Sequence, residues 1–165
     1  STPLDQTFHM IEEPRRYVAY LDIYQEGYDE KEYDMMVKKL QNAHENFPLI
    51  GNSSKGAVLD KEEVLQGRYN RFIGTFFTVD TPTDPATFLR EGTYLTTYYH
   101  GGYDNTARLL PRMLEHASSK GYRLAGHVLE IYVLVIHETA HPEEFVTKLQ
   151  FRVEPVASKE GKTDE

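Results

Sequence analysis

The chain has 165 residues, a formal net charge of -8, no cysteine and no tryptophan, but twelve tyrosines and eight phenylalanines. The lack of cysteine excludes disulfides, thiol catalysis and cysteine-based metal sites, and no apolar run approaches the roughly 18 residues that a membrane-spanning helix needs. Together these two absences lead us to expect no membrane partner and a cytoplasmic location. An acidic chain repels nucleic-acid phosphates and attracts organic cations, so we expect no direct contact with DNA.

The first half of the chain is predicted to form a strand, a helix and two further strands, over residues 16–24, 30–44, 56–59 and 68–79. Alternating and aromatic-rich runs predict the strands. Asp29 is the expected N-cap of the helix, and Glu32, three residues later, completes a capping box. The turn residues at 81–85, Thr-Pro-Thr-Asp-Pro, then divide the chain into two halves.

The same order of elements is predicted again in the second half, over residues 93–100, 105–121, 128–136 and 145–153. Asp104 is the expected N-cap of this second helix, and Gly121 is the expected stop. Pro111 lies inside the helix and is expected to kink it locally.

These elements predict an α+β fold with antiparallel sheets and helices packed on one side. The duplicated strand-helix-strand-strand units cover about 12–80 and 90–154, and a charged tail follows at 155–165. We expect residues 1–165 to form a single domain with a ligand cleft between the two halves, since ligand sites favour such junctions.

The run Val128-Leu129-Glu130-Ile131-Tyr132-Val133-Leu134-Val135-Ile136 is apolar at both parities, which predicts a strand buried on both faces. Glu130 interrupts it with a carboxylate, and burying a charged carboxylate costs several kcal/mol. Glu130 is therefore protonated, paired, or positioned to meet a cationic or hydrogen-bond-donating ligand. The alternative is that it lies at the mouth of the strand and reaches solvent.

The run His137-Glu138-Thr139-Ala140-His141 matches the zinc motif H-E-x-x-H, which requires a helix. Here β-branched residues precede it and Pro142 follows at once, so we interpret 137–144 as a polar hairpin loop. We expect no metal site, no cofactor and no catalytic residue. The paired acidic residues are predicted to be solvated charge in loops or at element ends, at Glu12-Glu13, Glu62-Glu63 and Glu143-Glu144.

The doubled element order, the turn His100-Gly101-Gly102-Tyr103 and the segment Leu129-Glu130-Ile131-Tyr132 resemble the GyrI-like effector-binding domain of multidrug-sensing (BmrR-like) MerR-type transcriptional regulators. This resemblance implies that Glu130 meets the charge of lipophilic cations at the bottom of an aromatic pocket. The implied walls, each with plain core packing as the alternative, are Tyr132, Tyr33, Phe145, Tyr69 and Tyr103.

The resemblance further implies a ligand-binding domain that senses hydrophobic, cationic small molecules. DNA would be bound only through a domain absent from this chain, in a full-length homodimer. Two alternatives stay open: a stand-alone GyrI-like hydrolase with Glu130 as general base and Tyr132 or Tyr103 orienting the substrate, and a protein-interaction module with an acidic surface.

Overall fold

The computed structural model describes residues 6–22, 35, 54–100, 104–134 and 145–157. In chain order its elements are β1 (His9–Glu13), β2 (Arg16–Asp22), β3 (Lys55–Leu59), α2 (Lys61–Leu65), β4 (Phe72–Thr78), β5 (Phe88–Leu89), β6 (Gly92–His100), α3 (Asp104–Ser119), β7 (Tyr122–Leu134) and β8 (Phe145–Pro155). No helix in these ranges combines the length and the apolar character needed to cross a membrane.

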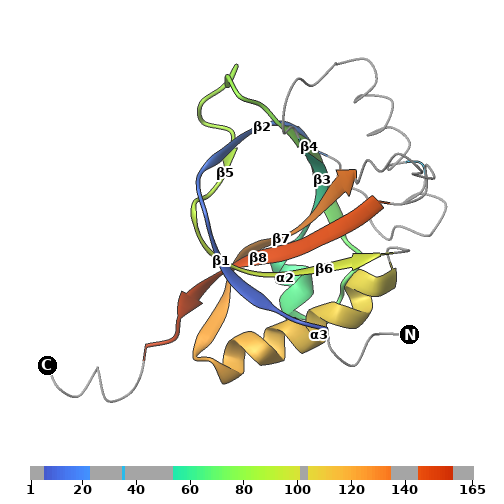
Figure 1. Cartoon of the computed structure of the whole chain (residues 1–165), viewed down its shortest axis with the longest axis vertical. Coiled ribbons are helices and arrows are strands. Elements are labelled where there is room, and N and C mark those ends of the chain that lie inside the picture. The colour runs from blue at the N-terminus through green and yellow to red at the C-terminus, as the bar shows by residue number, and fades with distance from the viewer. Residues whose placement is uncertain (1–5, 23–34, 36–53, 101–103, 135–144, 158–165) are drawn as a thin grey trace, which may run out of the picture.

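Within the described ranges, eight strands form one sheet in the order β1-β6-β8-β7-β3-β4-β2-β5, and each neighbouring pair is antiparallel. The sheet curls so that β2 and β5 arch over β6, β7 and β8, and α3 lies along the outer side of the curl (Figure 1). The prediction of an antiparallel sheet with helices packed on it is confirmed for the described residues.

Six of the strands lie in an order that is symmetric about the boundary between β7 and β3. The consecutive strands β6, β7 and β8 lie as β6-β8-β7, and the strands β2, β3 and β4 lie as β2-β4-β3. The two sets meet where β3 pairs with β7, and Ala57 is the direct partner of Glu130 in that pairing.

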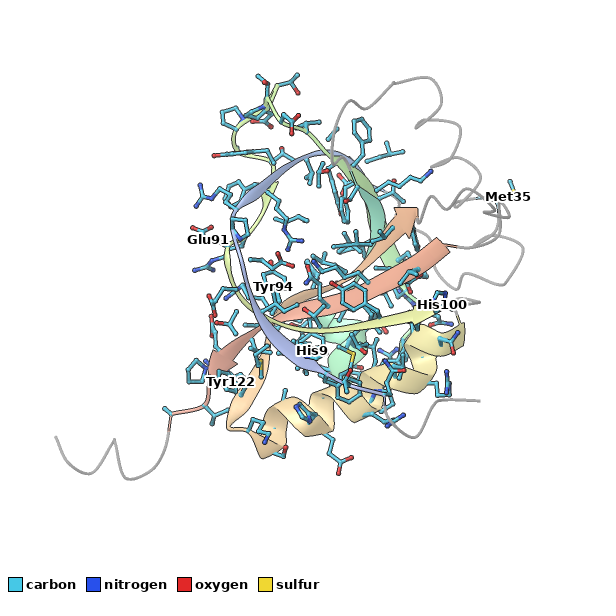
Figure 2. The ribbon with its side chains drawn as sticks, viewed as in Figure 1. His9, Met35, Glu91, Tyr94, His100 and Tyr122 are labelled. Carbon is cyan, nitrogen blue, oxygen red and sulfur yellow. The ribbon has the colours of Figure 1, made fainter. Side chains whose placement is uncertain are left out.

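The two faces of the sheet carry separate apolar cores because side chains alternate along each strand. An outer core packs the sheet against α3, where buried residues recur at helical spacing through Leu109, Leu110, Met113 and Ala117. An inner core, inside the curl, contains Val18, Val58, Phe76, Leu89, Tyr94, Leu129 and Ile131. Figure 2 shows Tyr94 on this inner side.

The end of α3 follows the predicted chemistry. The helix ends at Ser119, and Gly121 has a φ of 82°, in the left-handed region that glycine adopts without a Cβ penalty. The amide of Gly121 donates to the carbonyl of Ser118, which closes the last turn.

Several elements differ from the sequence predictions. The strand β1 was not predicted, and Glu13, its last residue, has a largely buried side chain rather than the solvated charge predicted for it. The strand predicted over 68–79 begins only at Phe72, and the short helix α2, which was not predicted, follows β3. Asp60 caps α2 by accepting from the amide of Glu63.

The strand β7 begins at Tyr122 instead of residue 128, and a register irregularity between Leu124 and Val128 joins the two parts. The two-residue strand β5 was also not predicted. The predictions for the helix over 30–44, apart from helical Met35, for the loop over 137–144 and for the end of the tail lie outside the described residues.

Candidate functional site

Glu130 lies in the middle of the sheet and has no exposed surface. Its strand, β7, is covered on one edge by β3 and on the other by β8, where Ala57 and Leu149 are its direct partners. Both partners belong to the outer core. The alternative that Glu130 reaches solvent at the mouth of the strand is therefore wrong.

Tyr132 shares the face of Glu130 because it follows two residues later in the strand. Its hydroxyl donates a hydrogen bond to Oε1 of Glu130 at 2.8 Å. Tyr132 is 9% exposed, so this hydrogen bond is made in a nearly dry environment. The predicted placement of these two side chains on one face is confirmed.

Apolar side chains of the outer core lie around the Glu130–Tyr132 pair. Val128 lies on the same face of β7, and the outer core adds side chains from α3 and from the neighbouring strands. A carboxylate in such a setting attracts a positive charge strongly, because little water screens the interaction. The pair can therefore act chemically as a hydrogen-bond acceptor for a cation, or as an acceptor for a proton.

The remaining predicted site residues divide into two groups. Tyr69 is half-buried and packs against the outer core, which is the core that contains Tyr132. Tyr33 and Tyr103 lie outside the described residues, and so does the side chain of Phe145, whose backbone pairs with Leu134. The H-E-x-x-H segment also lies outside them, and the ranges that the structure describes hold no group of three or more histidine, aspartate or glutamate side chains suited to a metal.

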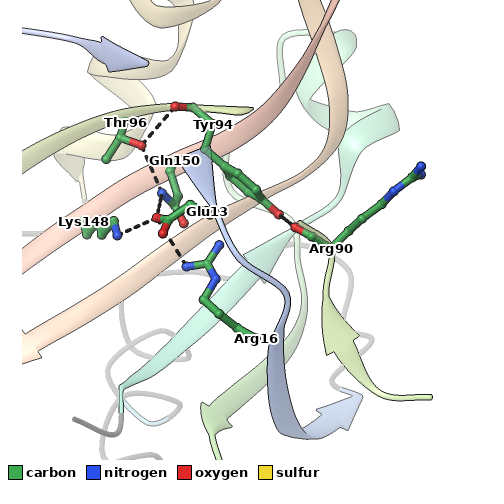
Figure 3. A network of polar contacts seen from close by, with 7 residues as sticks. All are labelled: Glu13, Arg16, Arg90, Tyr94, Thr96, Lys148 and Gln150. Carbon is green, nitrogen blue, oxygen red and sulfur yellow. Dashed lines mark hydrogen bonds and ion pairs between the residues drawn. The ribbon is translucent and has the colours of Figure 1, made fainter. Parts of the chain in front are cut away.

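A second polar cluster lies on the opposite face of the sheet, inside the curl, and sequence reasoning missed it (Figure 3). We call it the inner network; it consists of Glu13, Arg16, Thr96, Lys148 and Gln150. Oε2 of Glu13 accepts from Lys148 Nζ at 2.7 Å and from Gln150 Nε2 at 2.8 Å, and it lies 3.6 Å from Arg16 Nη1. Gln150 Nε2 also donates to the Thr96 hydroxyl at 3.0 Å.

Glu13 is ionised within this network. Burial raises the pKa of its carboxyl, but hydrogen bonds from Lys148 and Gln150, together with the charges of Arg16 and Lys148, outweigh burial and hold the pKa below the ordinary value of 4.5. The signal in the sequence was the alternating polar set Lys148, Gln150 and Arg152, which puts an unusually polar stripe on a central strand.

Comparison with known proteins bears on the fold. No protein-family model matches the chain, and no curated protein matches it either. Among solved structures, the C-terminal domain of EcmrR is similar with a TM-score of 0.62 and 18% identity, over 93% of this chain and all of that one. EcmrR in its complex with DNA is similar with a TM-score of 0.66 and 19% identity, over 91% of this chain and 58% of that one. At these identities the likeness shows a shared fold.

Proposed function

We propose that this chain is the effector-binding domain of a bacterial transcriptional regulator, and that it binds hydrophobic, cationic small molecules at Glu130. The observation that carries the proposal is a carboxylate with no exposed surface, hydrogen-bonded to Tyr132 inside an apolar core. The fold supports it, because the C-terminal domain of EcmrR shares this fold and EcmrR forms a complex with DNA.

Glu130 selects ligands by charge in this proposal. A lipophilic cation brings a positive charge to the buried carboxyl group, and its apolar parts replace water against the outer core. Aromatic walls add roughly 0.5–2 kcal/mol for each cation–π contact. Because neither effect demands one ligand shape, a range of cations is recognised.

The position of Glu130 supports a cleft between two related halves. It lies on β7, directly opposite Ala57 of β3, at the boundary about which the strand order is symmetric. We place the ligand at this junction and assign Tyr132, Tyr69, Tyr33, Tyr103 and Phe145 as its aromatic walls. In the same proposal one domain includes both halves, and the full-length protein is a cytoplasmic homodimer that binds DNA through another domain and belongs with the GyrI-like sensors of MerR-type regulators.

Titration of a fluorescent lipophilic cation tests the role of Glu130. We expect Glu130→Gln to weaken binding by about tenfold or more, because a charge-assisted contact of roughly 1.5–3 kcal/mol is lost. Glu91→Gln is the matched control: it removes one carboxylate charge from an exposed ion pair with Arg15. Equal affinities for wild type and Glu130→Gln would remove Glu130 from the site.

The hydrogen bond between Tyr132 and Glu130 also favours a second candidate, a small-molecule hydrolase. Glu130 would take a proton from water as the water oxygen attacks a strained-ring carbon and the bond from that carbon to the ring heteroatom breaks. The heteroatom would take up a proton from solvent, and a tyrosine hydroxyl would orient the substrate. Turnover of a strained-ring electrophile should then be lost in Glu130→Gln. Turnover that survives this substitution would exclude Glu130 as the base.

A further inference from the structure

Two neighbouring arginines, Arg15 and Arg16, differ in the hydrogen bonds that the Nε–Nη2 edge of the guanidinium makes. Arg15 donates from Nε and Nη2 to the two carboxylate oxygens of Glu91, at 3.1 Å each. In Arg16 both Nε and Nη2 are buried, and neither has a hydrogen-bond partner among the described residues. The guanidinium edge that binds a carboxylate in Arg15 therefore makes no hydrogen bond of ordinary geometry to the described residues in Arg16.

The Arg16 guanidinium is held in place by its other contacts. Nη1 lies 3.6 Å from Glu13, and the guanidinium carbon lies 5.1 Å from the centre of the Tyr94 ring. The Tyr94 hydroxyl donates to the carbonyl of Arg90 at 2.5 Å, which fixes the ring. The side chain is anchored on one side, so its Nε–Nη2 edge presents two fixed donors.

Gln150 provides an independent second observation. Its side chain has no exposed surface, and its Oε1 is buried without a hydrogen-bond partner in the described part of the chain. Nε2 of Gln150 and Nη1 of Arg16 both approach the same atom, Oε2 of Glu13. Two side chains that contact Glu13 therefore carry one acceptor and two donors with no hydrogen-bond partner among the described residues, although buried polar groups are normally satisfied.

The charge of the inner network suits an anion. Arg16 and Lys148 carry two positive charges, and the ionised Glu13 supplies one negative charge, so one positive charge remains. Arg152, on the same face, is engaged by Glu154 at 3.1 Å and by the carbonyl of Ala125 at 2.6 Å. The network also reaches the surface, because the side chains of Arg16 and Lys148 keep 17% and 18% of their exposure.

We propose that the inner network is a second binding site, for a small oxyanion that carries a hydroxyl group. Two oxygens of the anion accept from Nε and Nη2 of Arg16, and its hydroxyl donates to Oε1 of Gln150. The site is distinct from Glu130, because Gln150 and Lys148 are the partners of Leu129 and Ile131, whose side chains point to the opposite face.

Glycolate and acetate form a matched pair of probes, since they differ in the hydroxyl that Gln150 would accept. NMR spectra of the arginine Nε–H groups report the contact directly, at ionic strength held constant with sodium chloride. We expect a saturable shift of the Arg16 signal, with glycolate binding more tightly than acetate. Responses that stay linear with concentration would show that the site holds water only and would overturn the proposal.

Three variants separate the roles of the residues. Arg16→Gln should weaken glycolate binding by about tenfold or more, because its contacts are charge-assisted. Arg15→Gln, the matched control with an exposed guanidinium, should bind glycolate as wild type does. Gln150→Met should keep acetate binding and lose the preference for glycolate. Unchanged affinity in Arg16→Gln, or an unchanged preference in Gln150→Met, contradicts the site, and the wild-type spectra decide the matter even where a variant does not fold.

Discussion

Replacement of Glu13 by glutamine tests how much the inner network contributes to stability. The substitution keeps the shape of the side chain but removes the counter-ion of Lys148, which lies 2.7 Å away, and of Arg16, which lies 3.6 Å away. Glu13 is only 10% exposed, so water replaces little of the lost interaction. A glutamine oxygen can still accept one hydrogen bond, while its amide group faces other donors.

The expected cost is about 2–3 kcal/mol, between the roughly 1.5–3 kcal/mol of a hydrogen bond to a charged group and the roughly 3–5 kcal/mol of breaking a fully buried ion pair. For a chain of this size, each kcal/mol lowers the melting temperature by roughly 2–4 °C, so the midpoint should fall by about 4–12 °C. Urea unfolding at neutral pH measures the free energy directly.

The pH dependence gives an independent check. The pKa of Glu13 is lowered in the folded state, so its contribution is present above the ordinary value of 4.5 and is lost as pH falls through the folded-state pKa. The stability difference between wild type and Glu13→Gln should therefore shrink below about pH 4.5. A cost under about 0.5 kcal/mol at neutral pH, the range of ordinary surface substitutions, would refute the reasoning.

Three further predictions concern other positions. Tyr132→Phe removes a donor to the buried Glu130 and should cost about 1–3 kcal/mol, because a buried acceptor loses a hydrogen bond. We expect a larger loss than in Tyr99→Phe, because a buried carboxyl group costs more to leave unsatisfied than the hydroxyl of Thr106, to which Tyr99 is bonded; urea unfolding of both variants compares them, and a smaller loss in Tyr132→Phe would contradict this reasoning. Gly56→Ala should cost about 3 kcal/mol or more, because the added Cβ meets the backbone carbonyl of Glu130 and the buried ring of Phe76. In Gly74→Ala the atoms nearest to the added Cβ belong to the exposed ring of Tyr20, which can move, so the cost should be smaller; equal melting temperatures of the two variants would refute this contrast. Gly121→Ala forces a Cβ into a positive φ and should cost about 1–2 kcal/mol in thermal unfolding, and no change would show that the helix end adapts.

The sequence predicted those features that depend on local pattern. Alternation identified most of β2 and β8, and the content of threonine and tyrosine identified most of β6. The two-sided apolar run of β7 singled out Glu130 as a candidate buried carboxylate. Tyr132 followed from strand geometry alone, because a residue two positions later lies on the same face.

The features that were missed depend on contacts between distant segments. Glu13 bonds to Lys148 and Gln150, which are 135 and 137 positions away, and only the strand order brings them together. The helix α2 has a single buried residue, Val64, so its apolar periodicity is too weak to detect. A strand of two residues such as β5 exists only because β2 offers it a pairing edge.

The pairing of β3 with β7 also affects how the protein is made. On the ribosome β3 leaves the exit tunnel well before β7, and until β7 arrives one side of β3 offers unpaired amides and carbonyls to any passing strand. Contacts that span such a length of chain form slowly. A chain terminated before Tyr122 would therefore be prone to aggregate through the unpaired edge of β3. Chaperone binding to the nascent polypeptide would prevent this until β3 and β7 have paired.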